Sequence, residues 1–186
     1  MSMNKFTNKS LIEEPWNFPE AMLYQSIFNS STSVSIAIIG AHVCSELETL
    51  SKLTQVKSVA VFEPMTAYKD LLIKKLETLF KGRYLFSSAA VSNQNGFTIF
   101  HETNIPGTGS LLQIGSLSKK SYNMKHANSQ QCETIRFDDF CKTNDFHADI
   151  LWIDVQGAEM MVLEGAHKSL DSIHHIFIEI SIWEPT

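Results

Sequence analysis

The stretch Ile150-Leu-Trp-Ile-Asp154-Val-Gln-Gly157-Ala-Glu159 decides the fold of this chain. Four apolar residues run directly into Asp154, and a glycine follows three residues later. Such a run, bounded by a turn signal, predicts a buried strand of a parallel sheet with Asp154 at its carboxyl end. In an open α/β sheet that end is the rim where ligands bind. Asp154 is then either a ligand-binding carboxylate or a cap on the following helix, and this stretch alone favours neither.

Two earlier strands end in the same way. Val34–Ile39 is an apolar run that stops at Gly40, and Ser58–Phe62 is one that stops at Glu63. Glycine lets the backbone turn sharply and come close to a ligand. In nucleotide-binding α/β folds an acidic residue about 20 positions further on holds the ribose hydroxyls, and Glu63 has that spacing. The alternative is that Glu63 caps the helix that begins after Pro64.

The other expected elements follow from periodicity and turn residues. They are a helix from about Pro19 to Asn29, a helix that follows Gly40-Ala41-His42 and runs to about Leu53, a helix after Pro64, a strand at Tyr84–Val91 in a hairpin with Phe97–Phe100, a strand at Cys132–Phe137, a helix at Asp138–Lys142 begun by an acidic cap, a helix from about Ala158 to Leu170, and a last strand at His175–Ile180. Residues 101–130 predict a long loop that faces the substrate.

Strands alternate with helices, and Gly40, Glu63 and Asp154 all stand at strand carboxyl ends. This predicts an α/β fold with a doubly wound, Rossmann-like and mostly parallel sheet, and a ligand across its switch point. We expect residues 1–33 to form an N-terminal extension with a short helix and residues 34–186 to form the domain.

Composition narrows the class of protein. The 186 residues are 44% hydrophobic and 19% charged, as in an ordinary globular domain. A net charge of −5 argues against a large nucleic-acid surface. No apolar run approaches a membrane span, and the N-terminus lacks a secretory pattern, so we expect a cytoplasmic protein without nucleic-acid or membrane partners.

Cysteine and histidine spacing argues against a metal site or a disulfide framework. The three cysteines, Cys44, Cys132 and Cys141, have no C-x-x-C spacing, and the seven histidines form no H-x-x-x-H pattern. The pair His174-His175 points to opposite faces of a strand and is a poor chelate.

At these residues the chain resembles the FkbM-type S-adenosylmethionine-dependent methyltransferases, from about Val34 to Glu179. Ile153–Glu159 looks like the family's I-D-V-E-G-A-E, with Gln156 in place of Glu. Further stretches also resemble family segments: Phe62-Glu63-Pro64 its F-E-P, Ala89-Ala90-Val91-Ser92 its A-A-x-x before a glycine, Gly109-Ser110-Leu111 its loop G-S-x, and Thr134–Phe140 its T-L-D-x-L segment.

The first turn departs from the family pattern. Where the family typically has D-V-G-A-N-x-G, this chain has Ile38-Ile39-Gly40-Ala41-His42-Val43-Cys44. The resemblance therefore implies weak cofactor binding, because an acid and a glycine that face the cofactor are replaced. Methyltransferases of this class usually carry two more strands after the fifth. We accordingly expect a truncated C-terminal sheet and a homo-oligomer formed through the last strand.

The resemblance implies transfer of the sulfonium methyl group of S-adenosylmethionine to a hydroxyl of a sugar or another small-molecule acceptor. Asp154 or Glu159 would be the catalytic base, although Glu159 also suits the first turn of a helix. The implied cofactor-binding residues are Gly40, Ala41, His42, Glu63, Pro64, Ala89 and Asp154, and Ser110 would bind the substrate. A non-catalytic binding or assembly module remains the alternative. A dinucleotide oxidoreductase is disfavoured, because the first turn lacks G-x-G-x-x-G.

Overall fold

The computed structural model describes residues 24, 25, 27, 29, 31–115 and 123–180. Its main sheet has five strands: β1 (Val34–Ile39), β2 (Val56–Phe62), β3 (Tyr84–Ser87), β7 (Ile150–Ile153) and β8 (His175–Ile178). They lie in the order β3-β2-β1-β7-β8, and every neighbouring pair is parallel.

This order confirms the predicted doubly wound fold. The chain builds outward from β1 through β2 to β3, and then returns to the other side of β1 with β7 and β8. The switch point therefore falls between β1 and β7. Ile39 and Ile153 are opposite each other in the register, so Gly40 and Asp154 leave the sheet side by side.

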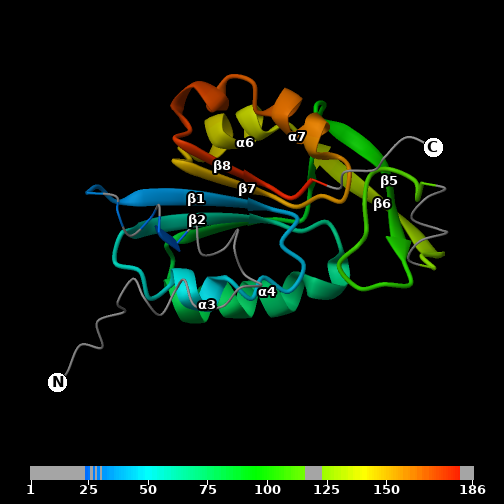
Figure 1. Ribbon diagram of the computed structural model, residues 1–186, viewed down its shortest axis with the longest axis horizontal. Coiled ribbons are helices and arrows are strands. Elements are labelled where there is room, and N and C mark those ends of the chain that lie inside the picture. The colour runs from blue at the N-terminus through cyan, green and yellow to red at the C-terminus, as the bar shows by residue number, and fades with distance from the viewer. Residues whose placement is uncertain (1–23, 26, 28, 30, 116–122, 181–186) are drawn as a thin grey trace.

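Helices cover both faces of this sheet (Figure 1). On one face lie α3 (Leu47–Leu50) and α4 (Thr66–Phe80), and on the other lie α6 (Phe137–Asn144), α7 (Glu159–Gly165) and the 3-10 turn η1 (Ser169–Ser172).

The alternation of side chains along β1 decides which core each residue enters. Ile36 and Ile38 pack with Leu72 of α4, whereas Ala37 and Ile39 pack with Phe137 of α6. A slip of one residue would exchange the two sets, so the buried faces fix the register.

A second sheet stands beyond the carboxyl ends of the main strands (Figure 1). It contains β4 (Ala90–Val91), β5 (Gly96–Thr103) and β6 (His126–Ile135) in the order β4-β6-β5, with β4 parallel and β5 antiparallel to β6. The predicted strand Tyr84–Val91 is therefore two strands in different sheets, and the predicted hairpin is wrong because β6 lies between β4 and β5. Both ends of the predicted loop 101–130 are also strand.

Several predicted helices are shorter than expected. Between Gly40 and Leu53 only Leu47–Leu50 is helical, because the chain first makes a turn in which His42 and Cys44 have positive φ. The helix predicted over Ala158–Leu170 ends at Gly165, where a Cβ atom would lie 2.0 Å from the backbone oxygen of Ser92.

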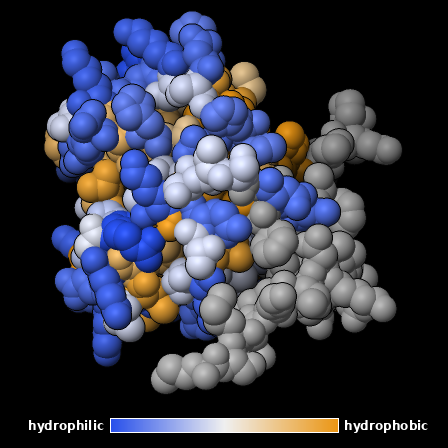
Figure 2. Space-filling view, turned by 90° about the vertical axis from the view of Figure 1, so that its left-hand side faces the viewer, coloured by the Kyte–Doolittle hydropathy of each residue, from blue (hydrophilic) through white to orange (hydrophobic). Residues whose placement is uncertain are grey.

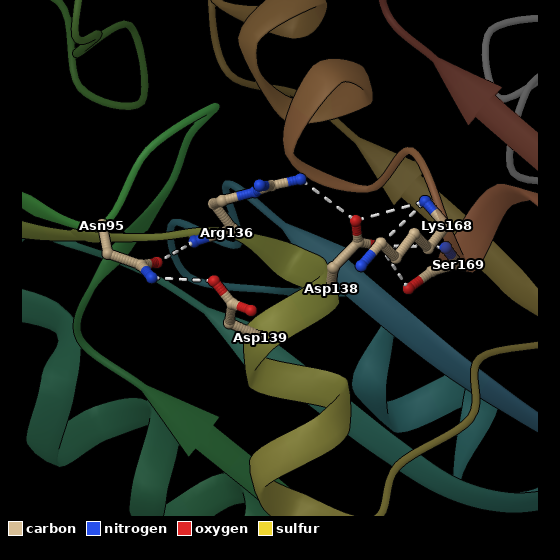
Figure 3. A network of polar contacts seen from close by, with 6 residues as sticks. All are labelled: Asn95, Arg136, Asp138, Asp139, Lys168 and Ser169. Carbon is tan, nitrogen blue, oxygen red and sulfur yellow. Dashed lines mark hydrogen bonds and ion pairs between the residues drawn. The ribbon is translucent and has the colours of Figure 1, made fainter.

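The acidic cap predicted for α6 is also wrong. Arg136 precedes the helix without a capping hydrogen bond from its side chain. Asp138 instead accepts hydrogen bonds from the backbone N–H groups of Lys168 and Ser169, and so ties α6 to the turn after α7 (Figure 3). Asn95 joins the same network by accepting from the backbone N–H of Arg136 at 2.7 Å.

At the N-terminus, Tyr24, Gln25, Ile27 and Asn29 are helical, as predicted, and Tyr24 and Ile27 are buried in the core on the α3–α4 side. The remainder of the predicted helix Pro19–Asn29 lies outside the described residues.

The last strand ends at Ile178 and is an edge of the main sheet, so pairing of two copies through it remains a prediction.

The end of the molecule where the parallel strands begin, opposite to the small sheet, has a largely hydrophilic surface with scattered apolar residues (Figure 2). Within the described ranges, no helix has the length and apolar character needed to cross a membrane.

Candidate functional site

A cavity opens at the switch point, and we call it the strand-end cavity. It holds about 530 Å³ of empty space, part of it open to solvent. Its polar wall is formed by residues that follow β1, β2 and β7: Gly40, His42, Glu63 and Asp154. Its apolar wall is formed by Ile39, Phe62, Pro64, Met65, Ala90, Val91, Phe100, Leu111, Val155 and Ala158, with Gly107 and Gly109.

Gly40 makes the close packing at the switch point possible. Its φ is +84°, and a Cβ atom there would lie 1.7 Å from the backbone oxygen of Asp154. No other residue type fits both the conformation and the space. The N–H groups of Gly40 and Ala41 both donate to the carbonyl oxygen of Phe62, at 3.1 Å each. The turn after β1 is therefore fastened to the end of β2 and rests on the turn after β7.

The next residues of this turn are held in a strained conformation. His42 has a φ of +48° and Cys44 one of +42°, the left-handed region that costs non-glycine residues on the order of 1 kcal/mol or more. Lys75 of α4 donates to the carbonyl oxygen of Val43 at 2.9 Å. The ring of His42 meets that of Tyr68 edge-on, with centroids 4.5 Å apart. Cys44 is buried in the core and does not line the cavity.

Glu63 is a buried carboxylate, with only 4% of its surface exposed. Its Oε2 atom accepts from the backbone N–H of His42 at 2.7 Å, and its Oε1 atom accepts from that of Met65 at 2.8 Å. Burial raises the pKa of this carboxyl, the two N–H donors lower it, and Asp154 raises it again. Glu63 thus satisfies the backbone just before α4, as the cap interpretation expects, and also lines the cavity. Each oxygen keeps a further lone pair for a ligand.

Asp154 has the more perturbed carboxyl group. Its backbone N–H donates to Ile39 at 2.9 Å, and its Oδ1 atom accepts a 2.5 Å hydrogen bond from the side-chain amide of Gln156. Burial and, to a smaller extent, the neighbouring carboxylates of Glu179 and Glu159 raise the pKa of Asp154 to about 6, against the hydrogen bond from Gln156, which lowers it. The carboxylate is bonded by Gln156 and not by the first turn of α7, which argues against the helix-cap interpretation.

A strap, residues 104–112, crosses the site from the small sheet. Ser110 pairs with His101 through both backbone hydrogen bonds, and its hydroxyl donates to the carbonyl oxygen of Val155 at 3.2 Å. A Cβ atom at Gly107 would lie 3.3 Å from the ring of His42, and one at Gly109 would lie 2.5 Å from that of Phe100. The two glycines therefore let the strap lie directly against the cavity.

On the far side of the strap lies a second hollow, which we call the outer cavity. Its empty space is about 1390 Å³, part of it open to solvent. It is lined by four strap residues, Ile105, Thr108, Ser110 and Leu112, and by the three residues that follow the strap. The other described lining residues are His101, Thr103, Met124, Gln156, Gly157, Glu159, Glu179 and Ile180. The β7–α7 turn and the strap together separate the two cavities.

The predicted site residues divide between these places. Gly40, His42, Glu63, Pro64 and Asp154 line the strand-end cavity. Ala41 and Ala89 are buried and lie outside its lining. Ser110 and Glu159 line the outer cavity, and Glu159 accepts from the backbone N–H of Gly157 at 2.8 Å.

Sequence reasoning missed most of the apolar wall. Phe100 and Leu111 come from the small sheet and the strap, and only the Gly-rich segment Pro106–Ser110 signalled that this part of the chain approaches a ligand. Met65 and Ala158 follow strand ends directly, so their position in the chain could have identified them.

Comparison with known proteins points to one family. The model of the methyltransferase FkbM domain matches residues 39–185. The 2-O-methyltransferase NoeI of Sinorhizobium fredii is 31% identical over 100 residues, which cover 50% of this chain and 41% of that protein. The crystal structure of the methyltransferase FkbM from Methylobacillus flagellatus KT matches with a TM-score of 0.50 and 14% identity, over 74% of this chain and 30% of that one. This chain thus spans less than half of either protein, and the structural match supports the fold alone.

Proposed function

The chain belongs to the FkbM methyltransferase family, and we propose that it binds S-adenosylmethionine in the strand-end cavity and methylates a hydroxyl group of a small molecule. The observation that carries this proposal is the meeting of Gly40, Glu63 and Asp154 at one switch point. Each follows a different strand, and the three could meet only if the sheet is doubly wound in the observed order.

The chemistry of the strand-end cavity suits a cationic nucleoside. Its described lining carries two carboxylates, Glu63 and Asp154, and no lysine or arginine. Glu63 has lone pairs that can accept hydrogen bonds from ribose hydroxyls, and Asp154 can face a positive sulfonium group. The apolar wall, with Phe62, Leu111 and Val91, offers a surface for a flat heterocycle.

S-adenosylmethionine, when bound, supplies a methyl group on a good leaving group, so the protein has to align the acceptor and remove a proton. Asp154 is the proton acceptor in this proposal. Gln156 occupies its Oδ1 atom and leaves Oδ2 for the acceptor hydroxyl. A pKa of about 6 keeps the group ionised at neutral pH while making it more basic than an ordinary aspartate.

Glu159 is the weaker candidate for the base. Its Oε1 atom is engaged by the N–H of Gly157, and it lines the outer cavity rather than the strand-end cavity. In this arrangement Glu159 stabilises the turn between β7 and α7, as an acid in the first helical turn does. We assign it no part in proton transfer.

One observation favours the non-catalytic alternative. In the first turn, the N–H groups of Gly40 and Ala41 are bonded to Phe62, and that of His42 is bonded to Glu63. The turn therefore has no spare N–H at these positions for the carboxylate of the cofactor. A protein that kept the fold for binding or assembly alone would show such a turn, and this is also why we expect weak cofactor affinity.

A matched pair of strap variants tests the cavity assignment. Leu111 lines the strand-end cavity and Leu112 the outer cavity, so Leu111→Trp fills the first and Leu112→Trp only the second. We expect calorimetry to give a dissociation constant in the tens of micromolar for S-adenosylmethionine, about −6 kcal/mol. Leu111→Trp should weaken binding at least tenfold, and Leu112→Trp should leave it within twofold.

The same experiment separates the alternatives. Purified protein that retains S-adenosylmethionine or its demethylated product in mass spectra would support cofactor binding, and methylation of an added acceptor would support catalysis. Absence of binding by the wild-type chain would overturn the proposal in favour of the non-catalytic module. Equal loss in both variants would mean that the cofactor does not lie in the strand-end cavity.

A further inference from the structure

We propose that β5 is the contact between two copies of this chain, which pair antiparallel through their Phe97–Ile99 segments about a two-fold axis at Thr98. The pairing joins two small sheets of three strands into one continuous sheet. It is independent of the proposed function, because neither Phe97 nor Ile99 lines the strand-end cavity.

β5 is an edge strand of the small sheet, and its outer side is only partly covered. The order β4-β6-β5 places no described strand beside β5 on the side away from β6. The strap covers that side at one place, where Ser110 pairs with His101 in an isolated antiparallel bridge. Between the start of the strand at Gly96 and this bridge, Phe97–Ile99 forms what we call the open edge.

The bridge to the strap shows which residues of β5 direct their backbone groups outward. His101 donates its N–H to the carbonyl oxygen of Ser110 at 2.8 Å and accepts from the N–H of Ser110 at 3.0 Å. Alternate residues of an antiparallel strand direct both groups to the same side, and the pairing of β5 with β6 is regular from Gly96 to Glu102. Phe97 and Ile99 therefore also direct N–H and C=O away from β6. The open edge presents these groups to a further strand.

The side chains of the same two residues make the open edge apolar. Phe97 is 72% exposed, the most of any large hydrophobic side chain in the described residues, and Ile99 is 46% exposed. Both stand on one face of the small sheet, whereas Phe100 points to the other face and is buried. The segment Gly96–Phe100 contains no proline and no charged residue, which are the devices that natural edge strands use against pairing. Neither the backbone nor the side chains therefore oppose a further strand.

The open edge is complementary to itself. An antiparallel partner placed about a two-fold axis at Thr98 sets Phe97 opposite Ile99 of the second copy, and Ile99 opposite Phe97 of that copy. In both pairs the two residues direct their backbone groups toward each other, so each pair exchanges two hydrogen bonds. The side chains lie on one face of the joined sheet and form cross-strand pairs of an aromatic and a β-branched residue, a favourable combination.

Other registers fit less well. A slip of one residue sets outward backbone groups against groups already bonded to β6, and the hydrogen bonds are lost. A two-fold axis at Phe97 would use Asn95, which precedes the strand, and one at Ile99 would use His101, which the strap already occupies. Thr98 is therefore the centre that engages both outward residues of each copy.

The contact is short, and this sets its expected strength. The bridge at His101 and the start of the strand at Gly96 limit the pairing to Phe97–Ile99. Its area falls at the low end of protein–protein interfaces, so we expect a weak dimer with a dissociation constant of about 10–100 μM.

Sedimentation velocity of the full chain over a concentration series tests the pairing. The mean mass of wild type should rise toward that of a dimer over the range of about 5–500 μM. Phe97→Lys and Ile99→Glu, made singly, should each weaken association about tenfold or more, because each places a charge against an apolar side chain of the second copy. The double variant should return to within about threefold of wild type, since each lysine then faces a glutamate. High salt should weaken the double variant and not wild type.

Two matched controls place a lysine on other exposed apolar positions. Leu71→Lys lies on α4 and Ile176→Lys on β8, the outer strand of the main sheet, and both native side chains are 42% exposed. Each should leave association within about twofold of wild type, because surface substitutions away from a contact act weakly. Circular dichroism checks that every variant is folded.

Amide hydrogen exchange, followed by NMR, resolves the register. Raising the protein concentration through the dimer transition should slow exchange at Phe97 and Ile99 by about fivefold or more, since their outward N–H groups become bonded. The N–H of Thr98 is directed to β6 in the single chain, so its exchange should not change with concentration.

Each outcome decides the proposal. A chain that stays monomeric over the whole series overturns it, as does a dimer that neither single variant weakens. A double variant as impaired as the single ones overturns the pairing about Thr98. A dimer that Ile176→Lys abolishes and Phe97→Lys leaves intact assigns the contact to the last strand instead.

Discussion

Asp138 and Asp154 are both aspartates, but their pKa values are shifted in opposite directions. The pKa of Asp138 lies below the usual value and that of Asp154 lies above it. Asp138 accepts from the N–H groups of Lys168 and Ser169, from the hydroxyl of Ser169 and from the guanidinium of Arg136, all within 2.8–3.2 Å (Figure 3). Burial alone would raise the pKa of Asp138, but these donors together hold it below its usual value.

Asp154 has the opposite environment. One amide donates to it, from Gln156, while the carboxylates of Glu179 and Glu159 lie near it and its pKa is raised to about 6. A carboxylate surrounded by donors is committed to holding the fold, because each donor would be left unpaired without it. A carboxylate kept partly unsatisfied in a cavity is available for a ligand or a proton. The comparison shows that the number of donors, set against burial and neighbouring charge, separates the structural acid from the proposed functional one.

Removing the structural acid should have the largest effect on stability. We expect Asp138→Ala to lower the free energy of unfolding by about 2 kcal/mol, because the part-buried donors of Ser169 and the guanidinium of Arg136 lose their acceptor. Urea denaturation measures this loss. Asp139→Ala is the control, since Asp139 accepts one exposed hydrogen bond from Asn95 and should cost less than 1 kcal/mol. Equal losses of unfolding free energy in the two variants would show that the hydrogen bonds to Asp138 do not hold the fold more strongly than the one to Asp139.

The functional acid should behave in the reverse manner. Asp154→Asn removes a carboxyl group whose pKa is raised in the folded state. Wild type therefore loses stability as pH rises from about 4 to about 6, and the variant does not. We expect the variant to be more stable than wild type by about 1 kcal/mol at pH 8, after allowance for solvent screening, and equal to it near pH 4. Methyl transfer should fall at least 100-fold. A variant less stable at pH 8 would contradict this account.

Replacing Gln156, which donates a hydrogen bond to Asp154, should have a smaller effect on methyl transfer than replacing Asp154 itself. Gln156→Glu restores the family residue but places a carboxylate where the amide now donates to Asp154. The pKa of Asp154 should rise, and the acid limb of the pH–rate profile should move to higher pH by about one unit. Cofactor affinity, measured by calorimetry, should change less than threefold. An unmoved acid limb would show that Gln156 does not tune the base.

Much of the site could be predicted because its signals are local. Apolar runs that end in Gly40, Glu63 and Asp154 report both a buried strand and the residue at its end, and neither needs knowledge of a distant contact. The same locality explains the errors. Nothing in Phe97–Phe100 reveals that its neighbour is β6 and not the preceding strand, and Asp138 finds its donors about 30 residues away.

The altered first turn shows what sequence comparison alone conceals. The chain keeps positive φ at His42 and Cys44, where the family pattern has asparagine and glycine, residues that tolerate this conformation. Ile38, in place of the family's acid, is 4% exposed and packs in the core between the sheet and α4. The turn therefore retains a strained backbone shape while its side chains serve packing.

The most direct test is a carbon-13 NMR titration of the aspartate carboxyl groups, with and without S-adenosylmethionine. The account predicts that Asp154 titrates near pH 6 in the free protein and Asp138 below its ordinary value. A sulfonium cation bound beside Asp154 should lower the pKa of Asp154 and leave that of Asp138 unchanged. An Asp154 that titrates near pH 4, or that does not respond to a saturating cofactor, would contradict the assignment of this carboxylate to the methyl-transfer site.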